Sequence, residues 1–178
     1  MSTLTEIINN FTNFFNGNNI KFVIGGGVAI KYLCNKYLTD KDVQINNLDI
    51  FYIANTPIAA SIIGGCPRIQ NAPCRSATYT TNDNFKINLT MNRVNNMRYV
   101  EFNDMKLMHP EDLISYYIDH FSFENIDINK INLLTDIIDI VSELPTLYIN
   151  KHNYLQTNKR RRTLSSGEPL ARRLFVES

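Results

Sequence analysis

Apolar side chains recur at every third or fourth position in two segments, which is the spacing of an amphipathic helix. In residues 2–15, Ser2 or Thr3 can cap such a helix and Gly17 can end it. Residues 128–144 carry the clearest pattern, which closes before a proline. We predict a helix in each segment. The predicted buried stripe of the second helix consists of Ile131, Leu134, Ile138 and Val141.

A run of β-forming residues at 20–24 leads directly into three consecutive glycines at 25–27. Residues 28–38 then show helical spacing, so the simplest interpretation is a strand, a glycine turn and a helix. Residues 48–54 are denser in β-forming residues than any other segment and predict a central strand.

The segment between Pro57 and Asp83 is ambiguous. Residues 58–63 are compatible with a short helix, and the rest of this segment is rich in turn-forming residues. Residues 84–94 then predict a further strand.

Residues 99–108 predict a β-hairpin that turns at Asn103 and Asp104. Residues 109–121 follow the rules for a helix start, because Pro110 suits the first turn and the two acids after it complement the helix N-terminus. The apolar pattern ends near residue 155.

The composition is that of a globular chain, with 178 residues of which 44% are apolar. No run approaches the roughly 18 apolar residues of a membrane span, and the first residues lack the basic start and apolar core of a signal peptide. We therefore expect neither a membrane span nor secretion. Cys34, Cys66 and Cys74 form no CxxC pair, which favours reduced thiols in an intracellular setting.

The charge is unevenly distributed. Residues 159–178 carry a local charge of +4, which leaves −3 for the remainder of a chain whose net charge is +1. This tail is typical of an arm that binds nucleic acid or a protein partner, and also of a nuclear-import signal. We expect an intracellular protein, with nuclear and virion-associated locations among the options. The basic side chains of the tail are Lys159, Arg160, Arg161, Arg162, Arg172 and Arg173.

A strand, a glycine turn, a helix and a second strand with acidic residues suit the transfer of nucleotides. Two carboxylates two residues apart on a strand point to the same face and can bridge two divalent metal ions. Such ions orient a triphosphate and activate the attacking hydroxyl group. A third carboxylate on a neighbouring strand would complete the site.

In the order of these elements, the chain resembles the nucleotidyltransferase superfamily, which includes polymerase β-like enzymes, poly(A) and CCA-adding polymerases and small antitoxin-type transferases. The resemblance covers about residues 20–120. It implies an α/β fold, also described as α+β, with a small mixed sheet flanked by helices, followed by C-terminal helices. In an active member, it further implies bound Mg²⁺ and NTP, with the phosphates held at Gly25, Gly26 and Gly27. The segments that carry it are FVIGGGVAIKYL (22–33), NNLDIFYI (46–53), FKINLT (85–90) and LMHPEDLISYYI (107–118).

The chain departs from the family pattern at the acids themselves. The most natural alignment places Asn47, Asp49 and Asn88 at the three metal-binding positions, so one carboxylate remains as the catalytic and metal-binding acid. Asparagine keeps a carbonyl oxygen but lacks the negative charge that Mg²⁺ favours beside substrate phosphates. This alignment implies the fold together with a degenerate metal site.

A second alignment remains open. Asp40 and Asp42 also have the i, i+2 spacing and follow Thr39, a common prelude to the family motif, although Lys41 occupies the apolar position between them. In this alignment, Asp40 and Asp42 bind the metal and Asp42 is catalytic. In the first alignment, both are solvated loop residues.

The other reactive side chains do not form a recognisable set. His109, His120 and His152 are isolated, which favours surface or capping roles over catalysis. Cys66 and Cys74 lie in a segment typical of a loop with buried thiols, and no Ser/His/Asp or Cys/His set is apparent.

We predict one nucleotidyltransferase-like domain at 1–155, with its core at 20–120 and a helical part at 109–145, and a basic tail at 156–178. The first functional hypothesis is a degenerate, non-catalytic member that acts as a nucleic-acid-binding, protein-binding or structural component, of viral origin among the options. The second is an active Mg²⁺-dependent enzyme that moves a nucleoside monophosphate from NTP to a hydroxyl of nucleic acid or protein. The third is a virion or assembly protein with no nucleotide role.

Overall fold

A computed structural model describes residues 3–38, 41, 43–54, 58–63, 66–69, 76–81, 83–91, 96–121 and 125–150. Its helices are α1 (Leu4–Gly17), α2 (Gly26–Tyr37), α3 (Pro110–His120) and α4 (Ile128–Val141). Its strands are β1 (Lys21–Gly25), β2 (Asn47–Ile53), β3 (Ile58–Ile63), β4 (Cys66–Ile69), β5 (Ser76–Thr80), β6 (Lys86–Met91), β7 (Asn96–Phe102), β8 (Met105–Met108) and β9 (Leu147–Asn150).

Seven strands form one mixed sheet in the order β5-β6-β2-β1-β8-β7-β9, and β3 and β4 pair in a second, two-stranded sheet. In the large sheet, β2 runs parallel to β6 and antiparallel to β1, while β1 runs parallel to β8. The predicted fold class, a mixed sheet flanked by helices, is confirmed. The predicted strand at 48–54 corresponds to β2, which lies inside the sheet.

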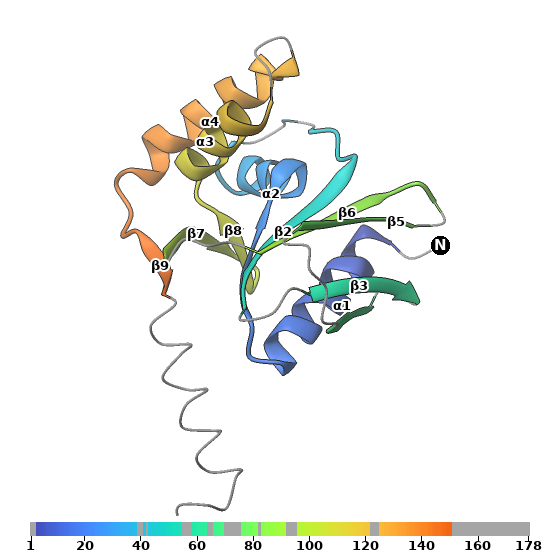
Figure 1. Ribbon diagram of the computed structural model, residues 1–178. Helices are drawn as coiled ribbons and strands as arrows, with labels where there is room; N and C mark the ends of the chain where they lie inside the picture. Colours follow the sequence, from blue (N-terminus) through green and yellow to red (C-terminus); the bar gives the residue numbers. More distant parts are fainter. Residues whose placement is uncertain are drawn as a thin grey trace, which may run out of the picture.

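Helices cover both faces of the large sheet (Figure 1). On one face, Phe15 of α1 packs its ring against Phe22 of β1 and Tyr52 of β2. The small sheet lies on this side too, and the Ile58 amide of β3 donates a 2.8 Å hydrogen bond to the Tyr52 hydroxyl. On the opposite face, α2 lies against the sheet, with α3 and α4 beyond it (Figure 1).

The helix starts and the hairpin turn form where the sequence predicts them. Thr3 caps α1 in a reciprocal arrangement with Glu6, and Pro110 occupies the first turn of α3. The hairpin between β7 and β8 turns at Asn103 and Asp104, which have φ values of +46° and +61°. Such left-handed conformations suit these two residue types.

Three features of the local structure were not predicted. Residues 58–63 form β3 instead of a short helix, because six residues make an unstable helix but can pair with β4. The turn-rich segment after them contains β4 and β5, and β9 was not expected at all. β9 pairs with β7, so its formation depends on a strand some 50 residues away in the chain.

The buried stripe of α4 also differs from the expectation by one position. Leu134, Ile137 and Val141 are buried, whereas Ile131 and Ile138 are half-buried. The spacing alone allowed either Ile137 or Ile138 on the inner face, and packing against α2 and α3 selects between them. None of the described helices is long and apolar enough to cross a membrane.

Candidate functional site: an Asn-Asp-Asn cluster at the glycine turn

The register of three strands brings together the polar residues of the first family alignment. Asp49 of β2 pairs with Gly25 of β1 on one side and with Asn88 of β6 on the other. Asn47 lies two residues before Asp49 on β2 and therefore faces the same side of the sheet. The glycine turn, one acid and two asparagines thus share a single location.

The two asparagine amides both donate hydrogen bonds to the carboxylate. Asn47 Nδ2 lies 2.7 Å from Asp49 Oδ2, and Asn88 Nδ2 lies 2.6 Å from Asp49 Oδ1. Asp49 is only 5% exposed. Each of its two carboxylate oxygens therefore relies on an amide donor, because little water can reach it. We refer to these three residues as the Asn-Asp-Asn cluster.

Burial raises the pKa of the Asp49 carboxyl above its ordinary value. The hydrogen bonds from Asn88 and Asn47, and the more distant charge of Lys130, act in the opposite direction because they stabilise the anion. Neutral amides leave the negative charge of a buried carboxylate uncompensated, which is why desolvation has the larger effect.

The glycines of the turn have different structural roles. Gly26 has a φ of +62°, and a Cβ atom there would lie 1.7 Å from Asp49 Oδ2. A Cβ at Gly25 would lie 2.4 Å from Cε2 of the Phe51 ring, whereas one at Gly27 would make only an ordinary contact, 3.6 Å from the Gln44 carbonyl oxygen. The turn therefore requires glycine at position 26 in order to accommodate Asp49, independently of any ligand.

Helices α3 and α4 supply the surroundings of the cluster. Burial raises the pKa of the Tyr117 hydroxyl, and the nearby negative charge of Asp49 adds to the increase. Burial and Asp49 have the same effect on the pKa of Tyr116. Lys130 of α4 is within electrostatic range of Asp49, but its ammonium group pairs with Asp127 at 3.6 Å. These neighbours of Asp49 could not be predicted from the sequence, because α3 and α4 lie more than sixty residues further along the chain.

The cluster is a poor fit for the two metal ions of an active nucleotidyltransferase. Mg²⁺ sites beside phosphates are built on carboxylates, and Asp49 is the one carboxylate here. Both of its oxygens already accept amide hydrogen bonds, so a metal ion would have to displace them. In the part of the chain that the structure describes, no three His, Cys, Asp or Glu side chains are grouped so as to hold a metal ion.

Several predicted site residues lie outside the described residues. These include Asp40 and Asp42 of the second alignment, Cys74, His152 and the basic side chains at 159–162, 172 and 173. Cys66 belongs to β4, but its side chain is not described. Their predicted roles stay predictions.

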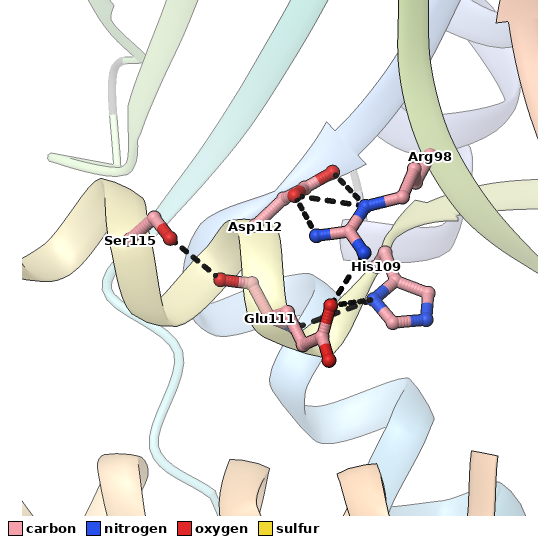
Figure 2. A network of polar contacts seen from close by, with 5 residues as sticks. All are labelled: Arg98, His109, Glu111, Asp112 and Ser115. Carbon is pink, nitrogen blue, oxygen red and sulfur yellow. Dashed lines mark hydrogen bonds and ion pairs between the residues drawn. The ribbon is translucent and has the colours of Figure 1, made fainter. Parts of the chain in front are cut away.

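A second polar network, formed by Arg98, His109, Glu111, Asp112 and Ser115, lies at the start of α3 (Figure 2). The Arg98 guanidinium donates to both carboxylate oxygens of Asp112, with Nε 3.1 Å from Oδ1, and also pairs with Glu111. The imidazole Nδ1 of His109 accepts a 3.4 Å hydrogen bond from the Glu111 amide and so caps the helix. The capping role considered for His109 is thus observed, but the sequence did not predict its arginine neighbour on β7.

No family model and no curated protein matches the chain. Among solved structures, the chain is similar to the lincosamide antibiotic adenylyltransferase LnuA in its lincomycin-bound form, with a TM-score of 0.49 and 10% identity over 76% of this chain and 98% of that chain. It is also similar to an antigenic nucleotidyltransferase-like protein from Paracoccidioides brasiliensis, with a TM-score of 0.40 and 13% identity over 78% of each chain. Because both TM-scores lie below 0.5, the function is inferred below from this chain's own residues.

Proposed function

We propose that this chain is a nucleotidyltransferase-type scaffold whose metal centre has been replaced by a hydrogen-bonded cluster, and that it acts as a binding component instead of a transferase. The observation that carries this proposal is the pair of hydrogen bonds from Asn47 and Asn88 to the two oxygens of Asp49. The amides satisfy the carboxylate in the way that metal ions would satisfy it in an active enzyme.

Charge supports the same conclusion. A triphosphate at the glycine turn would approach the Asp49 carboxylate, because Asp49 lies against Gly26 at the beginning of α2. Without metal ions between them, the phosphate and carboxylate charges repel each other in a site where little water screens them. The helix N-terminus favours an anion, but the Asp49 carboxylate already lies beside that end.

The binding role is assigned to the basic tail. The body of the protein is mildly acidic, whereas residues 159–178 carry a charge of +4. If this tail binds nucleic acid through its six basic side chains, the slope of log K against log salt should be no steeper than about −5. Removal of residues 156–178 should then abolish binding to single-stranded RNA or DNA, while retention of binding by 1–155 would place the nucleic-acid site elsewhere.

An activity assay tests the loss of catalysis. The full chain, Mg²⁺ and each of the four NTPs are incubated with nucleic-acid and protein acceptors, and incorporation is measured for the wild type and for Asp49→Ala. We expect no Mg²⁺-dependent transfer in either protein. Robust turnover that Asp49→Ala abolishes would establish the active transferase in place of the binding component.

A variant with a restored set of three carboxylates tests whether the asparagines are the reason that the cluster does not bind Mg²⁺. The double change Asn47→Asp and Asn88→Asp places three carboxylates together, which should repel one another until a divalent ion binds. We expect Mg²⁺ to raise the Tm of this variant and to leave that of the wild type unchanged. Asn13→Asp with Asn132→Asp, at exposed helical positions, is the matched control for added charge. An equal Mg²⁺ shift in the wild type would contradict the proposal.

The assembly hypothesis predicts a different result. Stable self-association or co-purification with a partner, together with no thermal shift on addition of NTP and no nucleic-acid binding by the full chain, would favour a virion or assembly protein.

A further inference from the structure

A cavity of about 350 Å³ lies beside the Asn-Asp-Asn cluster, on the same face of the large sheet. Phe51 follows Asp49 by two residues on β2, and Thr90 follows Asn88 by two residues on β6, so this pair of strands carries first the cluster and then the cavity wall. Two residues along a strand span about 7 Å. The cavity is therefore the next space along the sheet from Asp49, between the strands and α3.

The cavity walls are apolar and adaptable. Three methionines, Met91, Met97 and Met108, come from three different strands, and the Phe51 and Tyr116 rings meet edge to face with centroids 5.0 Å apart. Thioether side chains repack around ligands of different shape, and aromatic faces attract both apolar groups and cations. A volume of this size falls within the usual range of small-molecule pockets, about 300–1,000 Å³.

Among the residues that the structure describes, the charged groups at the rim have a negative balance. Asp112 and Asp119 both line the cavity. Arg98 compensates Asp112, but it also pairs with Glu111, so it brings no surplus positive charge. The Asp119 side chain makes no ion pair or hydrogen bond with any described residue. His120 also lines the cavity, and its Nδ1 lies 2.9 Å from the Tyr116 carbonyl oxygen.

We propose that this cavity binds a small organic cation, with an apolar or aromatic body against the methionines and Phe51 and one basic nitrogen directed toward Asp119. The apolar walls select the body, and the Asp119 carboxylate, which has no ionic partner among the described residues, selects the charge. This site does not depend on the metal centre, so it would exist whether or not the chain transfers nucleotides.

Three probes with one aromatic body and different head groups test the proposal: 2-phenylethylamine, 2-phenylethanol and phenylacetate. Each is titrated in EDTA into the full chain carrying ¹³C-methyl methionine, and the methyl signals are followed by NMR. The chain has five methionines, and Met105, which does not line the cavity, serves as an internal control. We expect the amine to shift the signals of Met91, Met97 and Met108 saturably and to leave Met105 unchanged.

The relative affinities of the three probes test whether the cavity selects a positively charged ligand. An exposed ionic contact contributes a modest amount, so the amine should bind about two- to fivefold more tightly than the alcohol. Phenylacetate should bind most weakly. Asp119→Asn should reduce the affinity for the amine to that for the alcohol, while Asp136→Asn, an exposed acid on α4 away from the cavity, should leave the preference intact.

A cavity-filling variant tests the location. Ser115 is exposed on α3 and lines the cavity, so Ser115→Phe should fill it and abolish the methionine shifts for all three probes. The proposal is overturned if the amine shifts none of the three cavity methionines, if phenylacetate binds as tightly as the amine, or if Asp119→Asn leaves the preference unchanged. The assay in EDTA reports on the cavity alone, so its failure is distinguishable from the detection of Mg²⁺-dependent transfer.

Discussion

The protein holds carboxylates in two contrasting ways. In the Asn-Asp-Asn cluster, a buried carboxylate is held by two neutral amides, whereas at the start of α3 two more exposed carboxylates share one guanidinium. The side chains of Glu111 and Asp112 are 47% and 33% exposed, against 5% for the Asp49 residue. The first arrangement is stabilised by hydrogen bonding in a dry site and the second by charge pairing in a wet one.

The two regions differ in how the negative charge of their carboxylates is stabilised. In the network around Arg98, one guanidinium pairs with two carboxylates, and these ion pairs tie β7 to α3, which is a structural role. The Asp49 carboxylate has two neutral amide donors and no ion-pair partner among the described residues, and it lies against the glycine turn. Substitutions in the Asn-Asp-Asn cluster and in the Arg98 network can test this contrast, and the largest effect is expected at the glycine turn.

Gly26→Ala should be the most damaging single change. It places a Cβ atom onto Asp49 Oδ2 and forces a non-glycine residue to a φ of +62°. Strain and overpacking together should lower the free energy of unfolding by about 3–5 kcal/mol, as measured by urea denaturation. Gly27→Ala is the control, because its Cβ would make only an ordinary contact, with the Gln44 carbonyl oxygen. If Gly26→Ala is no more destabilising than this control, the close packing of Asp49 on the turn is wrong.

Asn88→Ala should be the next largest effect, since it removes one of two donors to a buried carboxylate. A hydrogen bond to a charged group contributes about 1.5–3 kcal/mol, and the loss should depend little on salt because the site is dry. Thr78→Ala, at the exposed neighbouring position on β5, should change stability by less than about 0.5 kcal/mol. Equal losses in the two variants would mean that the amide contact contributes nothing.

Arg98→Met should have a smaller effect that does depend on salt. The guanidinium is 31% exposed, so solvent screens its pairs with Glu111 and Asp112. We expect a loss of about 1 kcal/mol at low salt, decreasing as salt is raised toward about 1 M. A salt dependence as weak as that of Asn88→Ala would remove the distinction between the two regions.

The pH dependence of Asp49 should follow from its burial. Because its pKa is raised in the folded protein, the native state binds this proton more tightly than the unfolded state, whose value is near 3.8. The stability of the wild type relative to Asp49→Asn should therefore be greatest below pH 3.8 and decline as pH rises through the folded pKa. Denaturation of both proteins between pH 4 and 8 measures this difference, and the opposite slope would contradict the assignment.

His109 should show the opposite slope in a different pH range. Burial and the neighbouring Arg98 charge lower its pKa from 6.5, so the native state favours the neutral ring. The stability of the wild type relative to His109→Gln should be fully present above pH 6.5 and decrease as pH falls through the folded pKa. A pH-independent difference between the two proteins would show that the ring charge does not matter.

The residues of the Asn-Asp-Asn cluster could be predicted from the sequence, but their contacts could not. Asn47, Asp49 and Asn88 were identified as candidates, and the structure brings them together, although their role as a degenerate metal centre stays a prediction. The contact between Asn88 and Asp49 was not predictable, because it depends on the parallel register of β2 and β6. The cavity beside them was also beyond prediction, because its walls come from strands and a helix that are distant in sequence.

The sequence by itself determined the features that depend on neighbouring residues. The Thr3 cap of α1, the Asn103-Asp104 turn and the start of α3 each follow from interactions within a few positions of the chain. Tertiary structure alone decided that 58–63 pairs as a strand, that β9 joins the large sheet, and that Gly26 is required by the carboxylate beside it. The physical reason is that strand pairing and burial depend on partners many residues away, which local preferences do not specify.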